Sequence, residues 1–253
     1  NYREIIMIIA EIGLNHFGQQ HIIDNYLDVL IQTSVDGITF QIREESYYEK
    51  KSKFKLSDDE YRRIGKLIKS KNKKFGIAIA DINKIDFLES IDVDFYKVIR
   101  NDITDKELMK KLIATKKQLI ISTGLSSDRD IEDFINEFGT KNITLNHTQL
   151  SHDVKDCNLS AIQKMKEKYN CDISFGTHCN NINVIYMSLC YQPSSILFYV
   201  KDDWPFNEYT DTKFPDDEHA VSMKEIHNVL DNIHELQHVI GNGIKQKMEN
   251  KIG

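Results

Sequence analysis

Eight short apolar runs alternate with amphipathic stretches along the whole chain, and this alternation most restricts the possible fold. The runs are rich in Ile, Val and Phe and mostly lack strict polar alternation, as expected for parallel strands buried on both faces. We predict strands at Ile5–Glu11, Gly37–Gln41, Phe75–Ala80, Phe95–Ile99, Gln118–Ser122, Ile143–Asn146, Ile173–Gly176 and Ile196–Val200. Predicted helices include His21–Thr33, Ser57–Ser70, Asp105–Ala114, Asp128–Phe138, Leu159–Tyr169 and a last one from about Asp217 to Val239.

This succession predicts a (β/α)8 TIM barrel, because eight strand–helix units of about 32 residues fill a barrel of about 250 residues. An open doubly wound sheet is the alternative, but its usual G-x-G-x-x-G turn is absent. Only 3 prolines and 11 glycines occur, which leaves no obvious linker. We therefore expect a single domain over residues 1–253.

Charge and apolar content exclude some classes of partner. The net charge of −6 gives no electrostatic reason to expect nucleic acid. No apolar run approaches the 18 or so residues of a membrane span, and no signal peptide is visible. The four cysteines lack C-x-x-C spacing, which favours free thiols in a reducing cytoplasm.

Polar residues follow nearly every predicted strand. Glu11, Asn15 and His16 come at the end of the first, where a strand that only packs a core would stop at a simple turn. Catalytic groups of TIM barrels sit at these carboxyl ends, so a site is expected there. For Glu11 two roles remain open: a structural pair with Lys97, or a general base or anchor for sugar hydroxyls.

Several segments resemble motifs of one enzyme family. "AEIGLNHFG" (10–18) is similar to the first-strand motif of the sialic acid synthase (N-acetylneuraminate synthase) family, and "IISTGLSS" (120–127) to its "ILSTGMS" strand. "DFYKVIRND" (94–102), "TLNHTQ" (144–149) and "ISFGTH" (173–178) resemble further strands. "FPDDEHAVSMKEI" and "GNGIKQKME" resemble the family's closing helix. The resemblance covers nearly the whole chain.

The resemblance implies a barrel that condenses phosphoenolpyruvate with an N-acyl amino-sugar aldehyde, giving a nine-carbon acid for surface glycans. It implies a Mn²⁺ or Mg²⁺ ion held by two histidines, and a homodimer. By this resemblance, the candidate catalytic residues are Glu11, Lys97 and His178. The candidate substrate-binding residues are Asn15, His16, Gln41, Arg100, Ser122, Thr123, Gln149 and Asp211.

The chain also departs from the family pattern. Thr39 stands where the phosphate-binding lysine is expected, Ala80 replaces a hydroxyl residue, and Gly176 replaces a serine. Arg100 replaces a serine; it either binds an anion or pairs with Asp81 or Asp102. These losses remove several donors, and charge-assisted hydrogen bonds contribute roughly 1.5–3 kcal/mol each.

The metal is in question as well. By the resemblance, Val200 stands where the family has its second histidine ligand. His178 alone is not a metal site, although His147 could supply a second imidazole and His152 a third. Both alternatives, a divalent metal and none, therefore stay open.

Three functions remain as hypotheses. The first is a sialic acid synthase-type enzyme, and the second an aldolase or lyase acting on a related sugar. The third is a non-catalytic protein that binds a glycan-pathway intermediate. We expect no counterpart of the family's C-terminal antifreeze-like domain within these 253 residues. The chain starts at Asn1 rather than Met, which leaves open that it is part of a longer protein.

Overall fold

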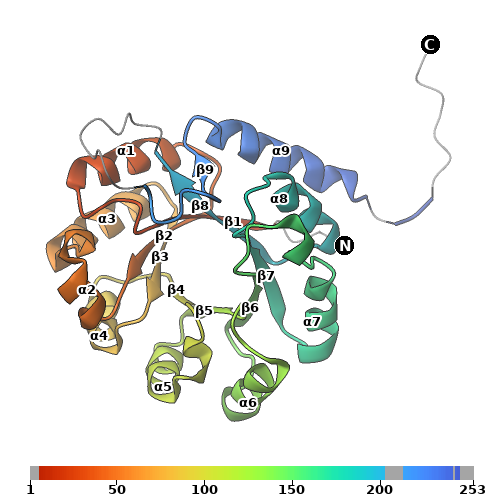
Figure 1. The fold of residues 1–253 in the computed structure, drawn as a ribbon, viewed down its shortest axis with the longest axis horizontal. Helices are drawn as coiled ribbons and strands as arrows, with labels where there is room; N and C mark the ends of the chain where they lie inside the picture. Colours follow the sequence, from red (N-terminus) through yellow and green to blue (C-terminus); the bar gives the residue numbers. More distant parts are fainter. Residues whose placement is uncertain (1–5, 203–212, 242, 246–253) are drawn as a thin grey trace.

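A computed structural model describes residues 6–202, 213–241 and 243–245. In it eight parallel strands form a closed barrel, because β1 pairs with β2 on one side and with β8 on the other (Figure 1). The strands are β1 (Met7–Gly13), β2 (Gly37–Ile42), β3 (Lys74–Ile79), β4 (Phe95–Val98), β5 (Gln118–Ser122), β6 (Ile143–His147), β7 (Asp172–Gly176) and β8 (Ser195–Lys201). This closure confirms the predicted barrel and excludes an open sheet, whose edge strands would each lack one neighbour.

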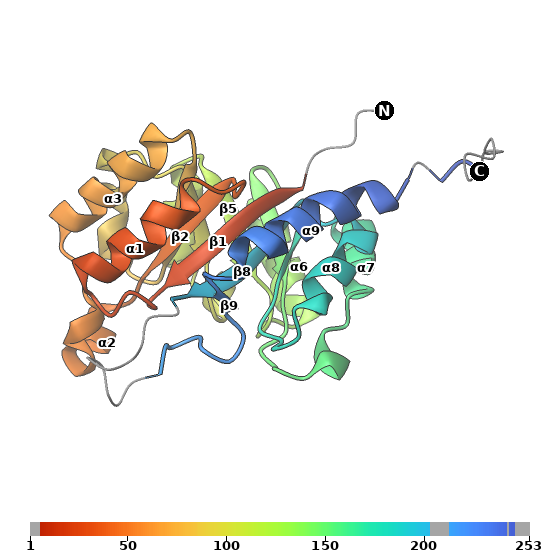
Figure 2. The same ribbon diagram turned by 90° about the horizontal axis from the view of Figure 1, so that it is seen from above.

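Helices surround the barrel on the outside (Figures 1 and 2). They bury one apolar face against the outward side chains of the strands, as Ile64 and Ile68 of α3 do. The helices are α1 (Gln20–Leu30), α2 (Glu45–Lys50), α3 (Asp58–Ser70), α4 (Ile85–Ser90), α5 (Lys106–Ala114), α6 (Asp128–Phe138), α7 (Ala161–Tyr169), α8 (Asn183–Ser188) and α9 (Ile226–Val239).

The prediction for the last helix was wrong at its start. The helix α9 begins at Ile226 rather than near Asp217, and a short strand β9 (Val221–Ser222) precedes it. Val221 pairs in parallel with Val200 of β8 and is almost fully buried. Tertiary pairing with a neighbouring strand thus overrides the helical pattern of this stretch. The consequence is that the residues just before β9 reach the barrel mouth.

Side chains inside the barrel form layers, because alternate residues of each strand point inward. Near the amino ends of the strands, Ile9, Phe95, Ile120 and Leu197 form an apolar cluster. Gly76 has no side chain because a Cβ there would lie 2.2 Å from the Phe95 ring. This layer closes the barrel below the carboxyl ends of the strands.

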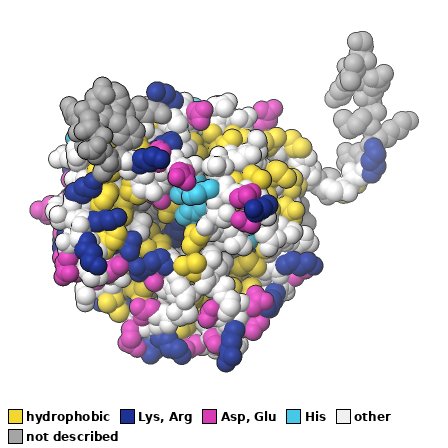
Figure 3. Space-filling model, viewed as in Figure 1, with side chains coloured by type: hydrophobic (Ala, Val, Ile, Leu, Met, Phe, Trp, Pro, Cys, Tyr) yellow, Lys and Arg dark blue, Asp and Glu magenta, His cyan; other side chains and the backbone are white. Residues whose placement is uncertain are grey.

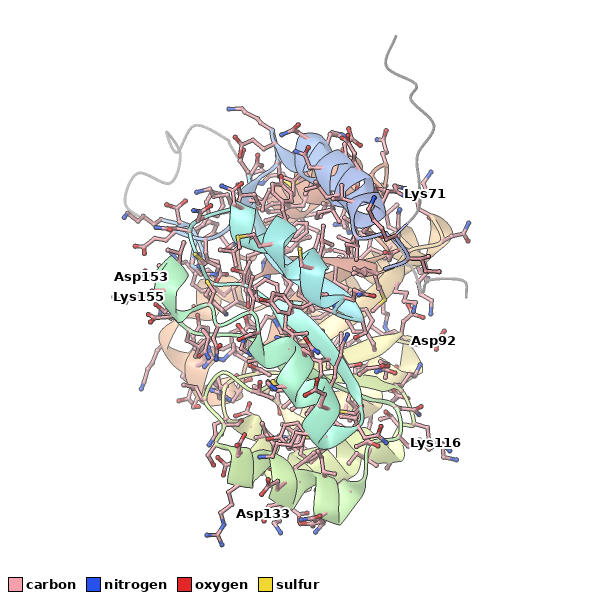
Figure 4. All side chains as sticks on the ribbon, turned by 90° about the vertical axis from the view of Figure 1, so that its right-hand side faces the viewer. Lys71, Asp92, Lys116, Asp133, Asp153 and Lys155 are labelled. Carbon is pink, nitrogen blue, oxygen red and sulfur yellow. The ribbon has the colours of Figure 1, made fainter. Side chains whose placement is uncertain are left out.

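The two ends of the barrel are built from different loops. In Figure 4, Asp153 and Lys155, which follow β6, lie on one side of the molecule. Lys71, Asp92 and Lys116, which precede β3, β4 and β5, lie on the opposite side. Strand-to-helix loops therefore gather at one end, the expected location of a TIM-barrel site.

Candidate active site

A buried ion pair lies inside the barrel at this carboxyl end. Lys97 of β4 donates from Nζ to both carboxylate oxygens of Glu11 of β1, at 2.6 and 2.8 Å. Only 6% and 3% of these two side chains are exposed, and the Tyr199 ring centre lies 5.5 Å from the ammonium nitrogen. Because either charge alone would be costly to bury, each side chain holds the other in place. Two of the three residues predicted as catalytic therefore meet, and Lys97 neutralises Glu11.

The ion pair forms part of the wall of a cavity of about 250 Å³. The predicted site residues that line this cavity are Glu11, Gln41, Lys97, Arg100, Ser122 and His178. The space-filling view shows a hollow near the centre of this face, with histidine side chains beside it (Figure 3). A cavity of this size and polarity suits a small charged metabolite better than a polymer.

Two arginines lie at the rim of the cavity. Arg43 forms two hydrogen bonds with Glu44 and stacks on the Tyr47 ring, 4.2 Å from its centre. Arg100 reaches Asp102 at 2.9 Å and Glu44 at 3.2 Å. The hydrogen bond from Arg43 lowers the pKa of the Glu44 carboxyl to about 2, so it stays ionised. Of the alternatives for Arg100, pairing with Asp102 occurs, and the guanidinium still lines the cavity.

Ser122 and Asn146 supply neutral polar groups from β5 and β6. Asn146 accepts a hydrogen bond from Ser174 through Oδ1, at 2.9 Å. A Cβ at Gly176 would lie 2.7 Å from the Asn146 amide nitrogen, so glycine there makes room for that amide. Thr123 instead donates from its hydroxyl to the Asn146 carbonyl oxygen at 2.9 Å, which ties the two strand ends together. It is not among the described residues that line the cavity.

Asn15 and His16 are buried and hold the loop after β1. Asn15 donates to the Val200 carbonyl oxygen at 2.8 Å and accepts from the Asp216 backbone N–H at 3.3 Å. His16 accepts from the Gly18 backbone N–H through Nδ1, and burial lowers its pKa to about 3. Neither side chain lines the cavity among the described residues, so their contacts position the site rather than a ligand.

Two further predicted residues lie elsewhere. Gln149 is half-buried after β6 and is not among the described residues of the cavity wall, which its neighbours Thr148 and Leu150 line instead. Asp211 lies outside the described residues.

Asp216 is a cavity residue that the sequence analysis missed. Burial, together with repulsion from the Glu11 carboxylate, raises the pKa of Asp216 from 3.8 to about 7. A carboxyl group with a pKa near neutrality can both give and take a proton at physiological pH. Asp216 was overlooked in sequence because it lies immediately before the predicted start of the last helix, near Asp217. No local pattern marked it, because "FPDDEHAVSMKEI" was matched only to the family's closing helix.

Three histidines meet at the mouth of the barrel. The centre of the His219 ring lies 4.5 Å from that of the His178 ring and 5.4 Å from that of the His152 ring. Burial is the main cause that lowers the pKa of His178 to about 3 and that of His219 to about 4. Both imidazoles are therefore neutral at physiological pH.

The structure does not bring His147 into this group. Its Nε2 lies 3.0 Å from the Cys157 carbonyl oxygen, and its ring packs against Phe175. His147 follows Leu145 at the next outward position of β6, so strand alternation turns its side chain away from the barrel interior.

The same alternation corrects the alignment of β8. Val200 belongs to the core between strands and helices, whereas Leu197 and Tyr199 face the barrel interior. The inward position nearest the mouth on this strand is therefore held by Tyr199, next to Glu11 of β1. On β2, by contrast, the alignment holds. Thr39 and Gln41 lie two residues apart on the inward face, so Thr39 does occupy the position where the resemblance places the phosphate-binding lysine.

A model of one protein family matches residues 25–245 of the chain, and that family is described as the NeuB family. The chain belongs to the NeuB family. This membership agrees with the resemblance found in the motifs at the strand ends. It also agrees with a site at the carboxyl end of a (β/α)8 barrel.

Relatives of the chain carry names from glycan biosynthesis. N,N'-diacetyllegionaminic acid synthase of Campylobacter jejuni is 23% identical over 95% of this chain and 79% of its own length. The enzyme of the same name from Legionella pneumophila is 22% identical over 97% of this chain and 76% of its own. The sialic acid synthetase of Leptospira borgpetersenii superposes with a TM-score of 0.84, at 22% identity, over 96% of this chain and 87% of that one. That structural likeness shows the shared barrel.

Two findings concern metals and membranes. Among the described residues, no three His, Cys, Asp or Glu side chains are arranged as a ready metal cage. Synthases of the NeuB family generally depend on a metal. In the same part of the chain, no helix is both long and apolar enough to span a membrane.

Proposed function

We propose that this chain condenses phosphoenolpyruvate with an N-acyl amino-sugar aldehyde to form a nonulosonic acid for surface glycans. The observation that carries the proposal is the Glu11–Lys97 pair at the base of a cation-rimmed cavity in a NeuB-family barrel. The relatives named legionaminic acid synthases support this substrate class. The reaction joins C3 of phosphoenolpyruvate to the aldehyde carbon, and with one water it releases inorganic phosphate.

Binding of phosphoenolpyruvate requires positive charge and several hydrogen-bond donors. Arg43 and Arg100 supply guanidinium groups at the rim, and their side chains are 19% and 40% exposed. Their present partners, Glu44 and Asp102, are partly solvated, so exchanging a carboxylate for the anionic ligand costs little. Lys97 lines the same cavity from inside the barrel, with its charge balanced by Glu11.

The sugar aldehyde needs polar groups and a proton. Gln41 and Asn146 offer amide groups to its hydroxyl and acylamino substituents. Asp216, with a pKa of about 7, can protonate the aldehyde oxygen as the new carbon–carbon bond forms. A divalent metal, when bound, would polarise the same oxygen.

The setting of the reaction follows from the same proposal. We place the enzyme in the cytoplasm, in accord with four free cysteines. Its partners would be the two small substrates, without nucleic acid or membrane, and a second copy of the chain in a homodimer.

The test uses the purified chain with phosphoenolpyruvate, Mn²⁺ and a panel of N-acetylated amino-sugar aldehydes. Phosphate release and a nine-carbon product in mass spectrometry are the expected results. Phosphoenolpyruvate at 100 times its Kd should also add about 2.7 kcal/mol to the free energy of unfolding. Replacing Lys97 by Met should abolish turnover, whereas replacing the exposed Lys106 by Met should not.

Other outcomes contradict the proposal in distinct ways. Cleavage of a nonulosonic acid to its aldehyde and pyruvate, without any response to phosphoenolpyruvate, indicates an aldolase or lyase. A thermal shift with sugars but no turnover indicates a binding protein.

A further inference from the structure

His219 is a buried side chain whose role the proposed reaction does not explain. Only 6% of its side chain is exposed, and neither ring nitrogen has a hydrogen-bond partner among the described residues. Asp216 Oδ1 lies 3.7 Å from Nε2, which is beyond hydrogen-bond reach. Burial lowers the pKa of His219 to about 4, so the neutral ring carries one N–H donor and one acceptor nitrogen. A polar group buried in this way calls for a partner.

The space beside His219 is an outer opening of about 400 Å³ that adjoins the active-site cavity. The two spaces share Leu150 and Pro215 as wall residues, whereas the Glu11–Lys97 ion pair lines the inner one. A small molecule whose reacting carbon lies near the ion pair therefore extends toward the outer opening. What the outer opening binds is a substituent of that molecule rather than its reacting end.

Apolar side chains stand beside the imidazole in this opening. Leu150 is 50% exposed on the shared wall, and Phe214 is buried with its ring centre 5.4 Å from that of Phe17. The position of Leu150 is set by the neighbouring loop, since a Cβ at Gly124 would lie 3.4 Å from the Leu150 Cγ. A half-exposed leucine at the edge of a pocket offers apolar surface to a ligand.

The charged groups around the opening balance one another. Asp217 accepts from Lys201 at 3.1 Å, and Glu218 Oε2 lies 3.1 Å from His152 Nε2. The exposed Lys213 also lines the opening and opposes the two carboxylates in sign. An ionic substituent thus meets no surplus of opposite charge. A neutral substituent with one hydrogen-bonding group and an apolar end matches the imidazole and Leu150.

We propose that this outer opening binds the acyl end of the sugar's N-acyl group, with His219 donating its N–H to the acyl carbonyl oxygen and Leu150 packing against the alkyl chain. The inference rests on the proposed function and adds two residues that select the sugar. Gln41 and Asn146 line the inner cavity, so they serve the hydroxyls and the amide N–H. Because the opening of about 400 Å³ far exceeds the roughly 30 Å³ share of one water molecule, acyl chains longer than acetyl should also fit.

The experiment measures binding of sugar alcohols, which lack the aldehyde and cannot react. The probes are mannitol, 2-acetamido-2-deoxymannitol and 2-butanamido-2-deoxymannitol, each titrated into the full chain and followed by ligand-observed nuclear magnetic resonance. The acetamido compound should bind about tenfold more tightly than mannitol, the gain expected for one hydrogen bond to a buried donor. The longer alkyl chain of the butanamido compound should add roughly two- to fourfold through contact with Leu150.

Variants assign these gains to residues. His219→Leu removes the donor and should bring the acetamido compound to the affinity of mannitol, whereas His219→Gln keeps an N–H donor and should retain most of the gain. Leu150→Asp should remove the extra affinity of the butanamido compound and change that of the acetamido compound by about twofold or less. His227→Leu on the exposed face of α9 is the matched control and should bind all three probes as wild type. Thermal unfolding verifies that each variant is folded.

Three results would overturn the inference. One is wild-type protein that does not distinguish the three probes, absence of binding included. Another is a loss in folded His219→Leu that is the same for mannitol and for the acetamido compound. The third is exclusion of the butanamido compound. None of these readings uses turnover, so acyl-dependent binding without phosphate release would support the inference and contradict only the synthase reaction. Phosphate release with equal kcat/KM for acylated and plain sugars would do the reverse.

Discussion

Two layers of side chains inside the barrel come from positions only two residues apart on the same strands. The pairs are Ile9 and Glu11 on β1, Phe95 and Lys97 on β4, Ile120 and Ser122 on β5, and Leu197 and Tyr199 on β8. The first members form the apolar cluster, and the second members line the cavity. Because strand alternation puts both members of a pair on the inward face, the strands deliver both layers with one backbone geometry.

The contrast separates stability from chemistry. The lower layer excludes water and contains no charged group, so its contribution is packing. The upper layer buries an ion pair and polar atoms, an arrangement that contributes little net stability but creates a field at the cavity. We expect substitutions in the two layers to have different consequences for unfolding and for activity.

The largest effect is expected for Lys97→Met in the upper layer. Removing the ammonium leaves the Glu11 carboxylate buried and uncompensated, which should lower the free energy of unfolding by about 3–5 kcal/mol and abolish turnover. Denaturant unfolding and the phosphate-release assay measure the two effects. In the double variant Glu11→Gln/Lys97→Met, stability should recover by more than half while activity stays lost. A double variant as unstable as Lys97→Met would contradict the ion-pair account.

A comparable loss of stability, but not of chemistry, is expected for Phe95→Ala in the lower layer. Truncation opens a cavity beneath Gly76 and should cost about 3–5 kcal/mol. Below its melting temperature, the variant should keep near wild-type kcat. Met187→Ala, at a side chain that is 61% exposed, is the control and should change stability little. A kcat reduced as strongly as in Lys97→Met would remove the distinction between the layers.

A smaller, pH-dependent effect is expected at His16, beside the upper layer. Its folded pKa is about 3, against 6.5 when unfolded, so between these values the unfolded chain binds the extra proton. The free energy of unfolding should therefore fall as pH drops from 6.5, by up to about 1.4 kcal/mol per pH unit.

His16→Asn isolates this contribution, because an amide oxygen can still accept from the Gly18 N–H and does not titrate. The stability difference between wild type and His16→Asn, from urea unfolding at several pH values, should shrink as pH falls from 6.5 to 4. The exposed His227→Asn should run parallel to wild type. A difference that is constant with pH would show that His16 is not held neutral by burial.

Much of the barrel could be predicted from the sequence because its signal is local. Every predicted strand overlaps an observed one, with ends shifted by at most two residues. Apolar composition over five or six residues is enough to mark a strand that is buried on both faces. The direct contact of Glu11 with Lys97 was also among the predicted alternatives, because a carboxylate in a barrel mouth is costly to leave unpaired.

The mouth was harder to predict because its residues depend on contacts distant in sequence. Asp216 lies just before, and His219 within, a stretch that was predicted to be helical but pairs with β8 through β9. Val200 was aligned with a ligand position, although its side chain points into the outer core. A one-residue shift in a strand reverses the face of every side chain, so motif alignment alone is weakest there.

The sequence by itself determined the order of strands and helices, the closed barrel and the polar carboxyl ends. These features follow from hydrophobic periodicity, which is a local property of the sequence. Only the tertiary structure decided which polar groups meet: Lys97 with Glu11, Arg100 with Glu44, and His178 with His219. These partners are 86, 56 and 41 positions apart (97 − 11, 100 − 44 and 219 − 178). Their proximity arises when barrel closure brings strand ends together, which no local pattern encodes.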